Sequence, residues 1–156
     1  ITSTAYWFST FMNVTDFTGL DYLNTANVTS MNSMFDDCIK VESLDVSNFD
    51  THNVTNMANM FSSCMKLKSL DVSKFDTRNV TNMYQMFLGC SNLTTLDVSH
   101  CDTRNVTSMY AMFRGCTSLT SLDVNNFDVS KATSFWSMFH SCTNLTSIFC
   151  DNSTNI

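Results

Sequence analysis

The sequence predicts an α/β solenoid, a leucine-rich-repeat-like right-handed coil with one short strand and one short helix in each 26-residue repeat. The first observation is a fixed period, because five cysteines recur every 26 residues: Cys38, Cys64, Cys90, Cys116 and Cys142. The second is that columns of Val, Met, Phe and Leu follow the same period without insertions. The third is that the apolar spacing changes within each repeat. Fixed periods of about 20 to 50 residues are typical of stacked repeats.

The predicted helix is clearest in residues 80–90. Apolar residues there are separated by gaps of three, three, one and three, which is the pattern of one face of a short helix. Polar residues around the first apolar position are suited to capping its start. The expected caps are Asn53, Asn79, Asn105, Thr55, Thr81 and Thr107.

The predicted strand follows in residues 93–98. From Leu93 through Leu96 to Val98 the spacing tightens to alternation, as in a half-buried strand. Neither the strand nor the helix could bury its apolar side alone. The repeats are therefore expected to stack on one another.

The repeats are expected to occupy residues 23–148, as about five copies. Residues 1–22 are interpreted as a degenerate N-terminal coil or cap, with Phe8 in the Met34 column and Met12 in the Cys38 column. Residues 149–156 are interpreted as the end of the last coil. We expect the chain to continue in a longer parent protein, because terminal repeats normally need a polar cap.

Composition and charge argue against several classes of function. The net charge of −6 argues against neutralising a nucleic-acid backbone, and no apolar run is long enough to cross a membrane. The three histidines, His52, His100 and His140, fall in different repeat columns, and no glycine-rich phosphate loop is present. The chain is therefore not expected to be an enzyme, and no cofactor is expected.

One repeat unit points to a known family. The segment "SLDVSNFDTHNVTNMANMFSSC", Ser43 to Cys64, resembles the BspA-like leucine-rich-repeat surface proteins, in the subgroup whose repeat reads LDVSxFDTxNVTxMxxMFxxCxxL. The match covers about residues 23–148. The resemblance implies an extracellular or cell-surface location and attachment to host or neighbouring-cell components.

These observations lead to a functional hypothesis. The chain is interpreted as a non-enzymatic extracellular repeat domain that presents an extended surface for adhesion or protein binding. The expected ligand-binding face consists of outward residues of the predicted strands: Ser43, Asp45, Ser47, Ser69, Asp71, Ser73, Thr95, Asp97, Ser99, Ser121, Asp123 and Asn125.

Two other functions remain open. One is a structural subunit of a cell-surface filament or fibre that assembles through its open repeat ends, since an exposed strand edge is a template for pairing. The other is an ice-binding or mineral-binding array formed by the aligned residues Thr51, Thr77 and Thr103.

Two acidic columns need separate interpretations. Stacking would place Asp45, Asp71, Asp97 and Asp123 in one outward row, where like charges repel unless a partner is present. Hydrogen bonds from neighbouring Ser and Thr, a bridging calcium ion and a ligand contact are the alternatives. The second column is expected to form turns: Asp50, Asp76, Asp102 and Asp128. Arg78 and Arg104 are expected to pair with Asp in the next coil.

The remaining candidate sites are the seven cysteines and the N-x-T or N-x-S sequons. The cysteine ladder is interpreted as buried, reduced thiols, with disulfides between coils and structural zinc as alternatives. Cys101 and Cys150 are expected to be small core residues. The possible glycosylation sites are Asn13, Asn27, Asn53, Asn79, Asn92, Asn105, Asn144 and Asn152.

Overall fold

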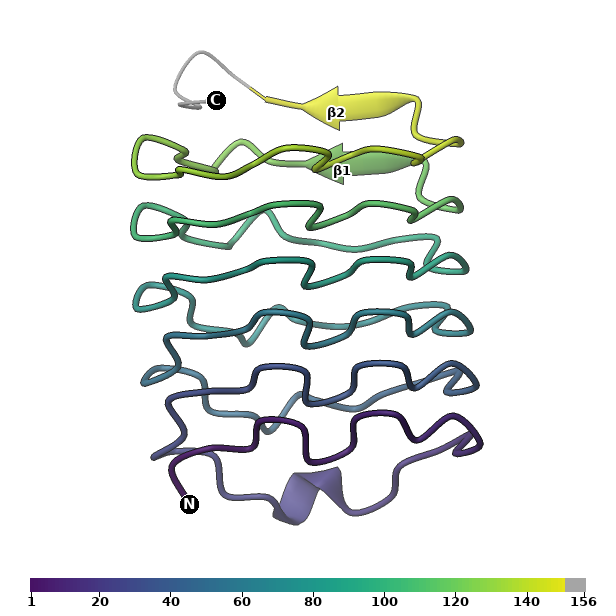
Figure 1. Ribbon diagram of the computed structural model, residues 1–156, viewed down its shortest axis with the longest axis vertical. Coiled ribbons are helices and arrows are strands. Elements are labelled where there is room, and N and C mark those ends of the chain that lie inside the picture. Colours follow the sequence, from purple (N-terminus) through teal and green to yellow (C-terminus); the bar gives the residue numbers. More distant parts are fainter. Residues whose placement is uncertain (151–156) are drawn as a thin grey trace.

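A computed structural model of the protein describes residues 1–150. Successive passages of the chain lie one above another, with the N-terminus at one end of the stack and the strand β2 at the other (Figure 1). We call each such passage a coil. Each coil corresponds to one repeat, because isolated parallel bridges join residues 26 positions apart, as in Asn56 to Asn82.

Regular secondary structure is nearly absent from residues 1–150. It comprises the 3-10 helix η1 (Leu20–Tyr22) and the strands β1 (Ser121–Asp123) and β2 (Ser147–Phe149). The two strands are parallel, with Ser121 opposite Ser147. No α-helix occurs in the described part of the chain. The predicted leucine-rich-repeat-like α/β solenoid, with a strand and a helix in every repeat, is therefore wrong.

Tight turns stand where the helices were predicted. The amide of Met60 donates to the carbonyl of Met57, and the amide of Cys64 donates to that of Phe61, at 3.2 and 3.3 Å. Such bonds close four-residue β-turns. The third residues of these turns, Asn59 and Ser63, have φ of 55° and 57°. A right-handed helix cannot contain this left-handed conformation.

The amides between the turn-closing ones point to the next coil. Asn59 donates to the carbonyl of Tyr84 at 2.8 Å, and Phe61 donates to that of Met86 at 3.0 Å. Successive amides therefore alternate between closing a turn and joining two coils. The three-residue spacings from Met83 to Met86 and from Phe87 to Cys90 therefore mark the first and fourth positions of turns and not one face of a helix.

The first coil has a different register. Tyr6 and Thr10 adopt positive φ, and the equivalent residues Ser33 and Asp37 follow 27 positions later. Phe8 stacks on Phe35, with ring centroids 5.4 Å apart. The expected alignment of Phe8 with Met34 and of Met12 with Cys38 is therefore wrong by one residue. The role of residues 1–22 as a cap stays a prediction.

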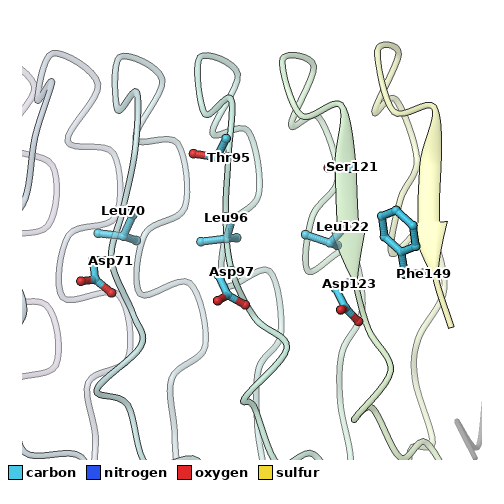
Figure 2. A pocket seen from close by; sticks show the side chains of 9 residues that line it. All are labelled: Leu70, Asp71, Thr95, Leu96, Asp97, Ser121, Leu122, Asp123 and Phe149. Carbon is cyan, nitrogen blue, oxygen red and sulfur yellow. The ribbon is translucent and has the colours of Figure 1, made fainter. Parts of the chain in front are cut away.

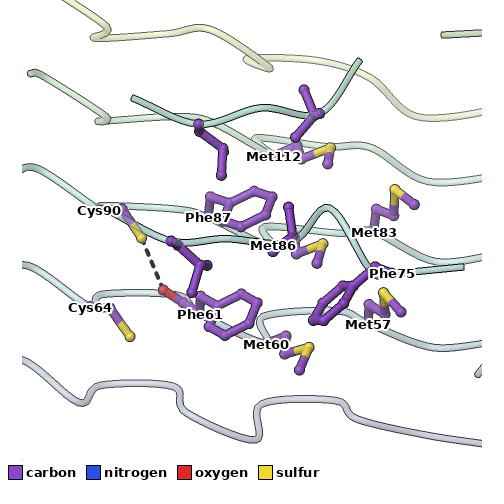
Figure 3. Packing of buried hydrophobic residues seen from close by; sticks show 14 of the residues in the cluster. Met57, Met60, Phe61, Cys64, Phe75, Met83, Met86, Phe87, Cys90 and Met112 are labelled. Atoms are coloured by element: carbon purple, nitrogen blue, oxygen red, sulfur yellow. Dashed lines mark hydrogen bonds between the residues drawn. The ribbon is translucent and has the colours of Figure 1, made fainter. Parts of the chain in front are cut away.

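Stacked phenylalanines form the centre of the core. Phe61 and Phe87 lie with their centroids 5.7 Å apart and their planes 8° from parallel, and the same contact recurs along the column. The further members of this column are Phe35, Phe113 and Phe139. Fully buried methionines such as Met57 and Met83 fill the space beside the rings (Figure 3).

Buried threonines join the coils at their edge. The hydroxyl of Thr51 donates to the carbonyl of Asp76 at 3.1 Å and accepts the amide of Asp76 at 2.7 Å. Thr77 and Thr103 make the same pair of bonds one coil further on. All three side chains are buried. The hypothesis of an ice-binding array on these threonines is therefore wrong, because no surface can reach them.

Candidate ligand-binding face and groove

An open groove lies across the side of the stack where the strands were predicted. Its volume is about 450 Å³. The lining residues come from successive coils: Leu70, Asp71, Thr95, Leu96, Asp97, Ser121, Leu122, Asp123 and Phe149. Figure 2 shows the Asp and Leu side chains repeating from coil to coil. Five of the nine, the Asp, Thr and Ser residues, belong to the ligand-binding face predicted from the sequence.

Sequence reasoning missed the apolar part of this lining. Leu70, Leu96 and Leu122 belong to the repeating apolar Leu column, and they are buried. Nevertheless they form the floor of the groove beside the Asp row. Phe149, which is 53% exposed, was expected only as part of an open end. The Leu-Asp pair in each repeat could have indicated this mixed lining, because it places an apolar side chain next to a charged one in every coil.

Each carboxylate of the row is held by a turn within its own coil. Oδ1 of Asp97 accepts the amide of Ser99 at 2.9 Å and its hydroxyl at 2.7 Å. Asp45 makes the same two bonds to Ser47, at 3.0 and 2.6 Å. Asp readily forms such bonds to the backbone two residues ahead. The expectation that Asp shares hydrogen bonds with neighbouring hydroxyls is confirmed at these two positions.

These hydrogen bonds favour the ionised form of Asp45 and of Asp97. The pKa of Asp97 is lowered, first by the side chain of Ser99 and then by its backbone amide. The pKa of Asp45 is lowered by Ser47 in the same order, while the charge of Asp71 opposes the shift. Oδ2 of Asp45 and Oδ2 of Asp97 receive no hydrogen bond from residues 1–150. One oxygen of each carboxylate is therefore open to a ligand.

Metal binding at the row has few protein ligands available. Within residues 1–150 no three His, Cys, Asp or Glu side chains gather closely enough to hold a metal ion. A calcium ion on Asp45, Asp71, Asp97 or Asp123 would therefore be ligated by no more than two of these carboxylates at once. Calcium prefers six to eight oxygen ligands, and the rest would have to be carbonyls, hydroxyls or water.

Comparison with protein families gives a match over nearly the whole stack. The family model described as "Mycoplasma protein of unknown function, DUF285" matches residues 3–70 and 63–154. The chain belongs to this family. Comparison with curated proteins finds no match, and comparison with solved structures finds none either. No helix in the described part of this DUF285 chain is long and apolar enough to cross a membrane.

The second acidic column of the DUF285 chain forms turns, as predicted. Oδ1 of Asp76 accepts the amide of Arg78 at 3.1 Å, and Asp102 and Arg104 repeat this contact. The arginines pair within their own turns, with Nη2 of Arg78 2.6 Å from Oδ2 of Asp76. The expected pairing with Asp in the next coil is therefore wrong. The Arg78 side chain is the main cause that lowers the pKa of Asp76.

The sequon asparagines of this DUF285 chain connect coils instead of capping helices. Nδ2 of Asn79 donates to the carbonyl of His52 at 2.7 Å, and Nδ2 of Asn105 donates to that of Arg78 at 2.9 Å. Asn53 makes the equivalent bond to Ala26. The expected helix caps are therefore wrong. Glycosylation stays a prediction, and the sequon at Asn152 lies outside the described residues.

The cysteine ladder of the DUF285 chain consists of free thiols. Cys64, Cys90 and Cys116 are buried, and burial raises the pKa of the Cys116 thiol to about 12. The expected burial is confirmed for these three and for Cys38, whereas Cys142 is only half-buried, and no cysteine in residues 1–150 forms a disulfide. Cys101 is buried as expected. Cys150 is exposed, so its expected place in the core is wrong.

Proposed function

We propose that this chain is a non-enzymatic repeat domain, extracellular or at the cell surface, that presents an extended face for adhesion or protein binding. The observation that carries the proposal is the coincidence of the groove with the face expected from the sequence, through Asp71, Asp97 and Asp123. The resemblance to BspA-like surface proteins supports the location and the class of partner. The partner is a protein or another cell-surface ligand and not a nucleic acid.

The chemistry of the groove favours an extended partner. Its floor is apolar and its rim carries ionised carboxylates with open oxygens, so it offers both contact area and hydrogen-bond acceptors. Small-molecule sites are usually more enclosed than this open surface. The backbone around the groove is already fixed by turns and bonds between coils, so little ordering is needed on binding. Basic or hydroxyl-rich groups are the expected counterparts of the carboxylates.

The test uses two variants with equal charge change. Asp71→Asn with Asp97→Asn removes two charges from the groove, and the amide oxygen can still accept the turn hydrogen bond. Asp16→Asn with Asp21→Asn removes two charges from exposed positions in the first coil. Beads coated with each protein are counted after washing on cultured epithelial cells. We expect the groove variant to lose attachment severalfold and the control variant to attach like the wild type. Equal attachment by both variants would contradict the proposal.

A second candidate function is a structural subunit of a surface filament or fibre. The observation that favours it is apolar surface at the two ends of the stack. Trp136 in the last coil is 76% exposed and Tyr6 in the first coil is 63% exposed. A pocket of about 240 Å³ opens in the last coils, lined by Val124, Phe127, Val129, Phe135, Met138 and Phe139. Light scattering with negative-stain imaging over a concentration series tests for end-to-end assemblies.

A further inference from the structure

The groove runs along the stack and crosses several coils. Its lining includes the consecutive residues Thr95, Leu96 and Asp97 of one coil, together with the equivalent Leu and Asp of the coils on both sides (Figure 2). Thr95 and Asp97 are exposed, while Leu96 between them is buried. The groove therefore has a hydroxyl rim, an apolar floor and a carboxylate rim.

A chain that follows this groove crosses the coils instead of lying beside one of them. Hydrogen-bonded strands lie about 4.8 Å apart, so Asp71 and Asp123, two coils apart, are separated by about 9.6 Å along the stack. Across the groove, from Thr95 to Asp97, the backbone advances by two residues, or about 7 Å. An α-helix with its side chains is about 10 to 12 Å wide, so it does not fit between these rims.

The carboxylate rim has no cation of its own. Asp71, Asp97 and Asp123 form no ion pair with residues 1–150, whereas the second acidic column pairs with arginines. No Lys or Arg lines the groove. Lys74 and His100 contribute to the lowered pKa of Asp71, after the larger effect of hydrogen bonds from Ser73, but neither forms an ion pair with it. A partner with positive charges therefore complements this rim.

The spacing of the carboxylates selects the conformation of the partner. In an extended strand, side chains on one side recur about every 6.7 Å, so neither one nor two such steps match the separation of about 9.6 Å. In a polyproline II helix, side chains on one side recur every three residues, or about 9.3 Å. Of the two extended conformations, only the polyproline II helix places successive cations opposite Asp71 and Asp123, with Asp97 between them.

We infer that the groove binds a polypeptide segment in the polyproline II conformation, which runs along the stack and has Lys or Arg at every third residue. This inference rests on the proposed binding function and names the class of its partner. The cations face the carboxylate rim, and an apolar residue such as proline in each turn of the partner covers the floor at Leu96. A polyproline II segment has no internal hydrogen bonds, so its carbonyls accept from the hydroxyls of Thr95 and Ser121.

Both sides of this contact are ordered before they meet. Oδ1 of Asp97 accepts the amide and the hydroxyl of Ser99, so the carboxylate is held in place, and Oδ2 receives no hydrogen bond from residues 1–150. A proline-rich segment is semi-rigid in the polyproline II conformation. Little conformational entropy is therefore lost on binding.

Two peptides of identical composition test the spacing. The matched peptide contains four repeats of Lys-Pro-Pro, and the displaced peptide contains two repeats of Lys-Pro-Lys-Pro-Pro-Pro. The two peptides have the same length and charge, but only the matched peptide has lysines three residues apart. We expect the matched peptide to bind the wild type severalfold more tightly in fluorescence anisotropy titrations. Because the contact is ionic and exposed, added salt is expected to weaken this preference.

Two double variants locate the binding site of the peptide. Asp71→Asn with Asp97→Asn removes two carboxylates from the groove, and Asp16→Asn with Asp21→Asn removes two exposed carboxylates from the first coil. We expect the groove variant to bind both peptides equally weakly and the control variant to keep the preference of the wild type. A groove variant that still prefers the matched peptide would overturn the inferred site.

The outcomes separate the inference from the function on which it rests. A spacing preference that is lost only in the groove variant supports the inference. A wild type that binds the two peptides equally, or binds neither, overturns the polyproline II partner, while the bead attachment of the groove variant decides the binding function separately. Tighter binding of a glucosamine oligomer with the same number of positive charges would overturn the polypeptide as the partner.

Discussion

The thiol of Cys90 donates a hydrogen bond of 3.1 Å to the carbonyl oxygen of Phe61, which lies 29 residues earlier in the chain (Figure 3). The same carbonyl accepts the amide of Cys64 at 3.3 Å, where it closes a turn. The contact recurs from Cys64 to Phe35 and from Cys116 to Phe87. Cysteine therefore recurs because a small buried donor fits between the turn of one coil and the turn of the next.

Replacing this donor tests its contribution. Cys90→Ala removes a buried sulfur and its hydrogen bond while Cys64 still satisfies the Phe61 carbonyl. We expect the free energy of unfolding to fall by about 1 to 2 kcal/mol, measured by urea denaturation. Cys150→Ala is the control, since this thiol is exposed. An equal loss of unfolding free energy in both variants would show that the hydrogen bond from Cys90 to Phe61 contributes nothing to stability.

The thiols also predict a pH dependence. Burial raises the pKa of Cys38 to about 11 and the pKa of Cys116 to about 12, whereas an unperturbed thiol titrates near 9.0. Above pH 9 the unfolded chain therefore loses these protons while the folded chain retains them. The stability that these thiols contribute is fully present below pH 9. It falls as the pH rises toward their pKa values in the folded chain.

The measurement is the urea midpoint at pH 7, 8.5 and 10. We expect the midpoint to be lower at pH 10 than at pH 8.5, with a smaller drop in Cys116→Ala than in the wild type. Since every other titrating group is shared by the two proteins, the difference between their drops isolates this thiol. Identical drops would rule out its contribution.

The left-handed turn residues predict opposite effects of glycine at two kinds of position. Gln85 has φ of 54°, where a side chain is strained, so Gln85→Gly is expected to stabilise the fold by about 0.5 to 1 kcal/mol. Gly115 has φ of 75° and its added Cβ would meet nothing closer than 3.6 Å. Gly115→Ala is therefore expected to cost about 1 kcal/mol through the backbone alone.

The melting temperature of each variant decides these predictions. Thr120→Gly is the control, because Thr120 is exposed and is not among the residues with positive φ. It should lower the melting temperature, since glycine there only adds conformational freedom to the unfolded chain. A lower melting temperature for Gln85→Gly would contradict the strain argument.

The buried threonine ladder predicts a costly substitution. Thr77→Val keeps the shape but leaves the buried amide and carbonyl of Asp102 without the hydroxyl they share. We expect a loss of about 1 to 3 kcal/mol in the free energy of unfolding. Thr81→Val is the matched control, because Thr81 is exposed and its acceptor, the carbonyl of Thr55, also receives the Thr81 amide. Similar urea midpoints for the two variants would contradict the stabilising role of the Thr77 hydroxyl.

The period of 26 residues and the direction of most side chains could be read from the sequence. The Met, Phe and Val columns are buried up to the last copy, where Met138 and Phe139 are half-buried, and Asp45, Asp71 and Asp97 point outward as expected. These features depend only on which residues repeat and on how an apolar group behaves in water. The face of the groove could be predicted for the same reason.

The conformation within each coil could not be read in this way. A spacing of three positions between apolar residues fits both one face of a helix and the first and fourth positions of a β-turn. Gln85 and Ala111, which hold left-handed turn positions, are good helix formers, so local propensity also favoured the wrong element. The turns are fixed by amides that bond to the next coil, and those bonds exist only after stacking. Leu96 was missed as a groove-lining residue because it was placed on the buried side of the predicted strand. A side chain that is largely buried can still line a groove.

The row of bonds from residues 109–115 to residues 134–140 has a further consequence, because all its amides face the same way. The stack therefore has polarity, with donors at one end and acceptors at the other. Two identical ends would oppose donor to donor, so a two-fold symmetric dimer cannot form through this row. Any association of two copies through such a row would therefore have to be heterologous, with the donor side of one copy against the acceptor side of the other.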